Sequence, residues 1–251
     1  MRMIHFYGKT DVGLVRQNNE DAYALDSACG FCIVADGMGG MAGGELASQM
    51  FIAAAQGIFV PGNLAEEKDR IEMVERTFWH ANDSILKHVE NNPHLKGMGC
   101  TAELVVFAEN RFIIGHMGDS RTYQLRNGEL KQLTKDHSLV QEQLDQGLIS
   151  DPQAAVHSMR NVILRAVGVE ENLQLDIIRG NIQAGDHYLL CSDGLTDMVA
   201  DGDIKNILSS DQNLAEKGDR LIAAALSAGG KDTVTVVVAM VGSCCSTEDT
   251  E

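Results

Sequence analysis

The amino-acid sequence predicts an α+β fold in which antiparallel sheets are covered by helices. Short apolar runs rich in β-branched residues occur in groups, and stretches with helical spacing occur in separate blocks. An Asn-Gly pair between two strand-like segments adds a typical turn of an antiparallel hairpin. Strict alternation of strands and helices would favour a doubly wound parallel sheet instead, and the sequence lacks that alternation.

Six apolar runs are expected to form strands, and one further segment a hairpin. The runs cover residues 31–35, 101–107, 111–116, 173–178, 186–191 and 234–241. The hairpin covers residues 121–134, where Asn127 and Gly128 tolerate the positive φ angles of a two-residue turn.

Helical spacing predicts three long helices, at residues 44–59, 65–90 and 214–228. Residues 138–160 are polar and interrupted by Gly147 and Pro152, so we expect an excursion from the core there. We expect one domain over residues 1–242, followed by a disordered acidic tail at 243–251, because charged termini without apolar residues are usually disordered.

The composition limits the classes of function. A chain of 251 residues with 44% hydrophobic content can bury a full core. Its 36 acidic and 20 basic residues give a formal charge of -16, which argues against nucleic acid as a partner because nucleic acid is held mainly by basic side chains. We expect a monomer.

The sequence also indicates the compartment. It has neither a leader-like apolar stretch at its beginning nor a run of about eighteen uncharged apolar residues, so we expect a cytoplasmic protein with no membrane partner. The cysteines lie mostly in apolar runs, without a second C-x-x-C pair at zinc-site distance, and are expected to be buried, reduced thiols. They are Cys29, Cys32, Cys100, Cys191, Cys244 and Cys245.

Four aspartates stand at or just beyond the ends of predicted strands: Asp36, Asp119, Asp193 and Asp232. The pair Glu20-Asp21 is a further acidic candidate. In one interpretation each aspartate only marks a turn, because Asp bonds its own backbone and the adjacent glycines tolerate positive φ angles. In the other, strand ends converge and bring the carboxylates together.

Converging carboxylates need cations, because burying unpaired charges costs several kcal/mol for each. No H-E-x-x-H motif or other zinc-type pattern of His and Cys accompanies these residues. An all-oxygen site selects hard ions such as Mg²⁺ or Mn²⁺. Two such ions can polarise a phosphoryl oxygen and activate a water, so the residues alone predict metal-dependent hydrolysis of a phosphate ester.

Other chemistries fit the sequence poorly. No cysteine has an arginine at C-x5-R spacing, the "GKT" at 8–10 lacks the preceding P-loop glycine, and no G-x-S-x-G is present. The "GMGGMA" at 37–42 weakly matches a dinucleotide fingerprint, but Asp36 directly before it would repel a pyrophosphate.

Six segments, taken in order, resemble the motifs of a known family. They are "GLVRQNNEDAY", "VADGMGG", "GDSRTYQLRNGELKQLTKDHSLV", "RNVILRAVG", "LLCSDGLTD" and "KDTVTVVV". Together they resemble the bacterial metal-dependent Ser/Thr protein phosphatases of the PPM or type 2C family, over residues 8 to 241. The resemblance implies a β-sandwich of two antiparallel sheets flanked by helices on both sides, a four-layer α-β-β-α arrangement, with metals at one end.

The resemblance also assigns roles to metal ligands. Asp36 resembles the carboxylate that bridges two core Mn²⁺ or Mg²⁺ ions, and Gly37 the residue that gives its carbonyl to the first ion. Asp193 and Asp232 resemble ligands of the second ion. Asp119, with Asp193, resembles the holder of a weaker third ion.

Further roles implied by the resemblance lie around the ions. Arg16 resembles the guanidinium that holds the substrate phosphate, which suits its planar bidentate fork. Glu20 and Asp21 resemble the acidic pair that orders metal-bound waters. The excursion at residues 138–160 is either an ordinary surface loop or, as loops on a rigid scaffold often carry specificity, a mobile flap beside the metal site. In the second case we expect His157 and Met159 to contact the surroundings of the phosphate.

Two positions depart from the family pattern. Met38 stands where many eukaryotic members have a histidine that can protonate the leaving group, so no side chain there can serve as an acid. Thr233 stands where the last motif usually has asparagine, and its hydroxyl can replace only some of the hydrogen bonds of an amide.

The implied activity is hydrolysis of phosphoserine and phosphothreonine by a metal-activated water without a covalent intermediate. The substrates would be phosphorylated proteins, the products of a partner Ser/Thr kinase. One alternative is a non-catalytic module that binds phosphoproteins, but all matching aspartates are intact. Another is a metal-dependent nuclease or nucleotide hydrolase, which the acidic charge and the lack of a basic aromatic groove disfavour.

Overall fold

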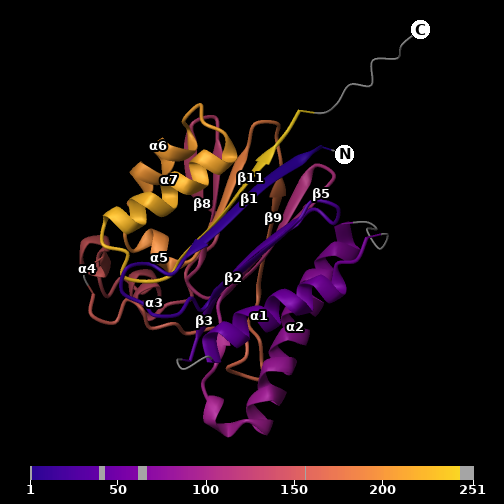
Figure 1. Cartoon of the computed structure of the whole chain (residues 1–251), viewed down its shortest axis with the longest axis vertical. Coiled ribbons are helices and arrows are strands. Elements are labelled where there is room, and N and C mark those ends of the chain that lie inside the picture. The colour runs from indigo at the N-terminus through magenta and orange to yellow at the C-terminus, as the bar shows by residue number, and fades with distance from the viewer. Residues whose placement is uncertain (1, 40–42, 62–66, 156, 244–251) are drawn as a thin grey trace.

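The structure, a computed structural model, describes residues 2–39, 43–61, 67–155 and 157–243. Two antiparallel sheets lie face to face (Figure 1). Sheet A contains, in order, β1 (Ile4–Asp11), β11 (Val234–Val241), β10 (His187–Cys191), β7 (Arg121–Arg126) and β8 (Glu129–Gln132). Sheet B contains β2 (Asp21–Asp26), β3 (Phe31–Met38), β5 (Ala102–Ala108), β6 (Arg111–Met117) and β9 (Asp176–Asn181), with β4 (Gly99–Cys100) paired to the end of β3.

Helices cover the outer face of each sheet. Sheet B packs against α1 (Gly43–Ile58) and α2 (Glu67–Asn91), whereas sheet A packs against α5 (Asp193–Thr196), α6 (Asp201–Leu208) and α7 (Leu214–Ser227) (Figure 1). The 3₁₀ turn η1 (Pro93–Leu95) follows α2, and the segment between β8 and β9 contains α3 (Leu139–Asp145) and α4 (Asp151–Ala155). The α+β class and the four layers expected from the sequence are therefore confirmed.

Buried apolar side chains form three layers: one between sheet B and α1 and α2, one between the two sheets, and one between sheet A and its helices. Each central strand contributes side chains to two of these layers. In β3, Phe31, Ile33 and Ala35 face α1 and α2, while Cys32 and Val34 face the other sheet. In β11, valines at 234, 236 and 238 face the helices of sheet A, and the alternate residues face sheet B. Because both faces of these central strands are buried, their sequences are continuous apolar runs and not alternating ones.

Most predicted elements are confirmed. The hairpin turn lies at Asn127 and Gly128, with φ angles of 51° and 78°. The strand expected at 173–178 lies three residues later, at β9. The strands β1 and β2 were not predicted: each lies at the edge of its sheet, β1 is only partly buried along its length, and both carry polar residues that break the apolar pattern.

The described cysteines Cys29, Cys32, Cys100 and Cys191 are buried free thiols, as predicted, and burial raises the pKa of each. Cys244, Cys245 and the acidic stretch at 244–251 lie outside the described residues. Among the helices of the described ranges, none combines the length and the apolar character needed to cross a bilayer.

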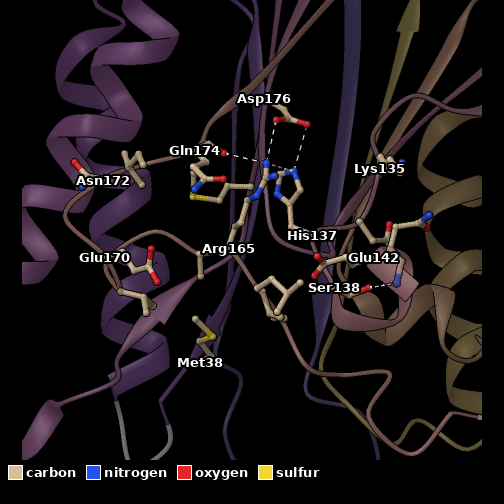
Figure 2. A pocket seen from close by; sticks show the side chains of 18 of the residues that line it. Met38, Lys135, His137, Ser138, Glu142, Arg165, Glu170, Asn172, Gln174 and Asp176 are labelled. Atoms are coloured by element: carbon tan, nitrogen blue, oxygen red, sulfur yellow. Dashed lines mark hydrogen bonds and ion pairs between the residues drawn. The ribbon is translucent and has the colours of Figure 1, made fainter. Parts of the chain in front are cut away.

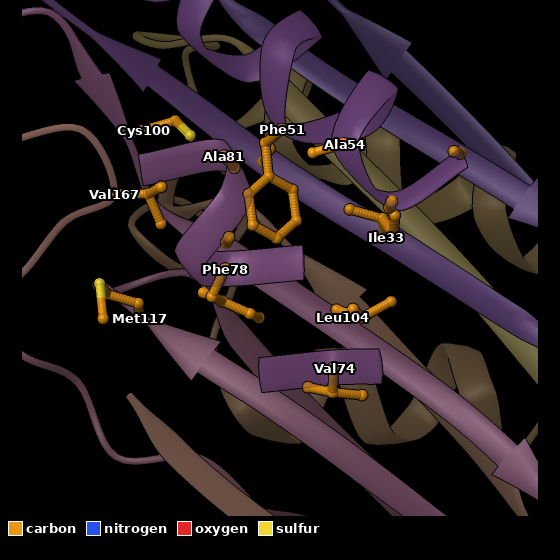
Figure 3. Close-up of a cluster of buried hydrophobic side chains, with 14 of the residues drawn as sticks. Ile33, Phe51, Ala54, Val74, Phe78, Ala81, Cys100, Leu104, Met117 and Val167 are labelled. Atoms are coloured by element: carbon orange, nitrogen blue, oxygen red, sulfur yellow. The ribbon is translucent and has the colours of Figure 1, made fainter. Parts of the chain in front are cut away.

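The packing of α2 onto sheet B gives a first prediction. Phe78 is fully buried, and its ring packs edge-on against Phe51 of α1 with centroids 4.9 Å apart (Figure 3). Phe78→Ala should therefore lower the free energy of unfolding by about 3–5 kcal/mol, measured by urea denaturation of the metal-free protein. The matched control is Trp79→Ala, the next residue of the same helix, whose side chain is 44% exposed. Equal losses in the two variants would contradict the core position of Phe78.

Candidate metal centre

The acidic residues singled out in the sequence meet at one end of the two sheets. Asp36 lies near the end of β3 and faces Asp21 of β2 in the strand register. Asp119 follows β6, Asp193 begins α5 directly after β10, and Asp232 precedes β11. With Glu20, Arg16 and Gly37, the side chains of Asp36, Asp119, Asp193 and Asp232 line a cavity of about 430 Å³, here called the acidic cavity.

Two glycines allow the backbone segments to approach this closely. A Cβ at Gly37 would lie 2.1 Å from the carbonyl oxygen of Gly44, where α1 begins. A Cβ at Gly194 would lie 1.9 Å from the carbonyl oxygen of Thr233. Glycine has no Cβ, so at Gly37 the start of α1 can pack against the end of β3. In the same way, Gly194 lets Asp193 lie beside the segment that carries Asp232.

Hydrogen bonds fix the turns that carry the carboxylates. Thr101 accepts a hydrogen bond from the backbone N–H of Asp36 at 3.2 Å, and its hydroxyl lies 2.7 Å from that of Ser120. His137 accepts one at Nδ1 from the backbone N–H of Gly118, at 3.2 Å. Burial lowers the pKa of His137 to about 4, which keeps this nitrogen available as an acceptor. The turn holding Asp119 is thereby tied to Thr101, between β4 and β5, and to the segment after β8.

The carboxylates strongly perturb one another. Burial, followed by the charges of Asp21, Asp193, Asp119 and Asp232, raises the pKa of Asp36 well above its usual range. Burial and the charges of neighbouring aspartates, Asp119 first, do the same to the pKa of Asp193. Burial, followed by the charge of Asp136, raises the pKa of Asp119 to about 7. In the absence of cations, the folded protein therefore holds these groups at a cost in free energy.

Asp21 lies behind the cavity, where hydroxyl groups surround it. It is buried and accepts hydrogen bonds from Ser192 Oγ at 2.8 Å and from Thr233 Oγ1 at 3.0 Å. The backbone N–H of Thr233 also donates to Asp232 Oδ1 at 2.8 Å. The threonine that replaces the family's asparagine thus still connects Asp21 to the segment of Asp232.

The donor set fits hard divalent cations. One oxygen of Asp119, Oδ1, is buried without any hydrogen-bond partner, and such orphaned acceptors are rare unless they serve a bound group. No three His, Cys, Asp or Glu side chains of the described residues are placed to hold an ion by themselves. An ion here would therefore complete its coordination with water and backbone carbonyls, which is typical of Mg²⁺ and Mn²⁺ and not of structural zinc.

Arg16 lies at the mouth of the acidic cavity. Its Nη2 donates to Asp232 Oδ2 at 2.6 Å, and its side chain remains 55% exposed. The guanidinium therefore keeps further N–H groups for a ligand while one edge is held by a carboxylate. Glu20 lies beside Gly44, and its backbone carbonyl accepts hydrogen bonds from Gly37 N–H at 3.1 Å and from Ser48 Oγ at 2.7 Å.

The segment that follows α4 contributes residues that the sequence did not single out. Asn161 and Ile163 line the acidic cavity, and Arg160 forms an ion pair with Asp197 at 2.9 Å. His157 and Met159 do not belong to the described lining, so their proposed contacts near the phosphate stay a prediction. Asn161 and Ile163 belong to the motif "RNVILRAVG". An asparagine and an isoleucine in a segment of mixed polar and apolar residues do not by themselves indicate a binding site.

The fold and the acidic cavity together define a class of protein: a helix-covered β-sandwich with an oxygen-rich site for hard divalent cations. The chain belongs to the Protein phosphatase 2C family, which its residues 14–229 match. Named relatives and solved structures agree with this assignment.

The serine/threonine protein phosphatase PstP of Mycobacterium tuberculosis is 42% identical over 239 residues, which cover 94% of this chain and 45% of PstP. The chain thus spans about half the length of that relative. The serine/threonine phosphatase stp of Listeria innocua is 38% identical, covering 94% of this chain and 95% of the relative. The catalytic domain of PstP, solved in complex with two manganese ions, superposes with a TM-score of 0.87 at 39% identity and covers 97% of this chain and 100% of that one.

The repulsion among the carboxylates predicts a dependence of stability on pH. Folding raises the pKa of Asp119 to about 7 and that of Asp36 well above its usual range, so Asp119 in the folded protein keeps a proton that the unfolded chain releases between about pH 4 and pH 7, and Asp36 acts in the same direction. The stability contributed by these groups therefore falls as pH rises through that window. Asp36→Asn removes one charge, so in EDTA the Tm of the variant should exceed that of the wild type by more at pH 7.5 than at pH 5.

Thermal melts of the metal-free proteins measure this difference, in which about 1 kcal/mol corresponds to roughly 2–4 °C. The matched control is Asp83→Asn, on the exposed face of α2. The difference in Tm between this variant and the wild type should be the same at both pH values. A Tm gain for Asp36→Asn that is equal at both pH values would contradict the repulsion.

Proposed function

We propose that this chain hydrolyses phosphoserine and phosphothreonine in proteins at a Mn²⁺ or Mg²⁺ site in the acidic cavity. The observation that carries the proposal is the set of converging, mutually repelling aspartates, of which Asp119 is buried with one oxygen unpartnered, beside the guanidinium of Arg16. The names of the two bacterial relatives reported above, both serine/threonine phosphatases, support this choice of substrate. The substrates would be proteins phosphorylated by a partner Ser/Thr kinase.

The residues that would hold two core ions are Asp36, the carbonyl of Gly37, Asp193 and Asp232, and Asp119 with Asp193 would hold a weaker third. The structure of PstP with two manganese ions supports the first two ions. When bound, such ions polarise a phosphoryl oxygen and lower the pKa of water so that it can attack at neutral pH. Glu20 and Asp21 would orient waters around the ligands.

The chain's own contribution is to bind and orient the phosphate monoester. Arg16 offers N–H groups at the mouth of the cavity, where charge-assisted hydrogen bonds to phosphate oxygens are strong. Asn161 also lines the cavity and offers a further side-chain donor. Met38 lines the cavity where the family often has histidine, so it excludes water without being able to donate a proton. The described lining contains neither cysteine nor serine, and the hydroxyl of Thr233, which does line the cavity, donates its hydrogen bond to Asp21.

A non-catalytic module that binds phosphoproteins is the second candidate. It would need neither the aspartate cluster nor its cost in stability. Because all four strand-end aspartates are retained and converge, we favour catalysis over simple binding.

The central test is release of phosphate from a phosphothreonine peptide with Mn²⁺ present and after chelation with EDTA. Asp36→Asn and Asp193→Asn should each lower the rate by about a thousandfold, because the shape of the site remains while the charge that holds cations is lost. Asp83→Asn on the exposed face of α2 should behave like the wild type. Activity that survives full chelation, or near-native turnover by Asp36→Asn, would contradict the proposal.

A further prediction separates Asp119 from the other ligands. With fewer protein ligands, a third ion should bind more weakly than the first two, so Asp119→Ala should keep two bound ions and lose only the weaker one. Hydrolysis of a phosphothreonine peptide should slow more than hydrolysis of an aryl phosphate, whose good leaving group needs less protonation. Metal counting by elemental analysis, together with both rates at saturating Mn²⁺, checks this. Loss of all metal, or unchanged peptide hydrolysis, would show that Asp119 has another role.

A further inference from the structure

A second cavity, of about 580 Å³, adjoins the acidic cavity and is here called the side cavity (Figure 2). Met38 and Ile163 line both cavities, so the two share one wall. The side cavity extends from this wall toward Arg165, His137 and Asp176, which form its floor through mutual contacts of 3.3 Å. A peptide bound at the metal site would therefore have to pass only Met38 and Ile163 to reach the side cavity.

The part of the side cavity next to the shared wall is apolar and open to solvent. Leu164 and Val169 line it, and they remain 44% and 45% exposed. Exposed large apolar side chains in a concave site favour covering by an apolar group of a ligand.

The charged groups of the side cavity are mostly paired. Lys135 contacts Asp145 at 2.5 Å, and Arg165 contacts Asp176 at 3.3 Å. Asp136 is held by Arg121 at 2.7 Å. These pairs leave little free positive charge for an anionic ligand.

Glu142 and Glu170 are the exceptions. Both line the side cavity, and neither has a cationic partner among the ion pairs of the described residues. Figure 2 shows them on opposite sides of Arg165. The uncompensated charge in the cavity is therefore negative and would attract a basic side chain.

We propose that the side cavity is a specificity subsite for the segment flanking the phosphorylated residue of the substrate, with an apolar residue against Leu164 and Val169 and a basic residue near Glu170. An extended peptide advances by about 3.3–3.6 Å per residue, so the side cavity is within reach a few residues from the phosphate. The inference rests on the proposed function and names its substrate class: phosphothreonine or phosphoserine segments with an apolar and a basic flank.

The test uses the Mn²⁺-loaded protein and phosphothreonine peptides with alanine flanks. A single arginine, glutamate or leucine replaces alanine in turn at each of the four positions before and the four positions after the phosphothreonine. On one side, arginine should raise kcat/KM about three- to tenfold through KM, as expected for a partly enclosed ion pair, and glutamate should lower it. The arginine effect should shrink as salt is added.

Glu170→Gln should abolish the preference for arginine, measured as the ratio of arginine peptide to alanine peptide on the same variant. The matched control is Glu171→Gln, the exposed neighbour that does not line the side cavity, and it should keep the preference. Likewise Leu164→Ser should reduce the preference for leucine, whereas Leu148→Ser, a 66% exposed residue outside the cavity, should not.

The outcomes separate this inference from the proposed function. If the wild type fails to hydrolyse even the alanine-flanked peptide with Mn²⁺, both are overturned. If it hydrolyses that peptide but shows no positional preference, only the subsite is overturned. Equal losses in Glu170→Gln and Glu171→Gln would assign the preference to the general negative charge of the protein and would overturn the subsite as well. A preference for glutamate would mean that Arg165 and Lys135 leave their partners to bind an acidic flank, again contradicting the inference.

Discussion

The mutual repulsion of aspartates at one end of the sandwich is the constraint on which the remainder of the site depends. Asp36, Asp119 and Asp193 come from three different strand ends, and burial together with their neighbours' charges raises the pKa of each. Such a cluster is tolerated only because the surrounding structure holds it in place and because divalent cations can neutralise it. Hydrogen bonds through Thr101 and His137, and the side-chain-free approaches at Gly37 and Gly194, provide that support.

The stability needed to hold this cluster comes from the burial of the central strands on both faces. Strands β3, β5, β10 and β11 each contribute side chains to two apolar layers, so each strand end is fixed by a helix layer and by the opposing sheet. Antiparallel strands with both faces covered read as continuous apolar runs, a pattern more often associated with parallel sheets. The carboxylates lie at strand ends because only there can water and ions reach them while the backbone remains packed.

The proposed sites for the phosphate and for the surrounding protein segment are separated in space. The acidic cavity offers oxygen ligands and Arg16, while the side cavity offers apolar side chains and two carboxylates without cationic partners. Met38, at the wall between them, replaces a possible proton donor with an apolar side chain. If the proposed subsite holds, variation along residues 135–176 would change substrate preference without disturbing the aspartates, as is common for loops on a rigid scaffold.

The sequence by itself determined the α+β class, the long helices, most central strands and the acidic residues of the site, because apolar runs, helical spacing and Asp-Gly turns are local signals. It missed the edge strands β1 and β2, whose exposed faces admit polar residues, and it placed β9 three residues early. Only the tertiary structure decided that Asp232 pairs with Arg16, that Thr233 supports Asp21, and that Asn161 and Ile163 reach the cavity. These contacts join segments far apart in the chain, and no local pattern of residues encodes which of them will meet.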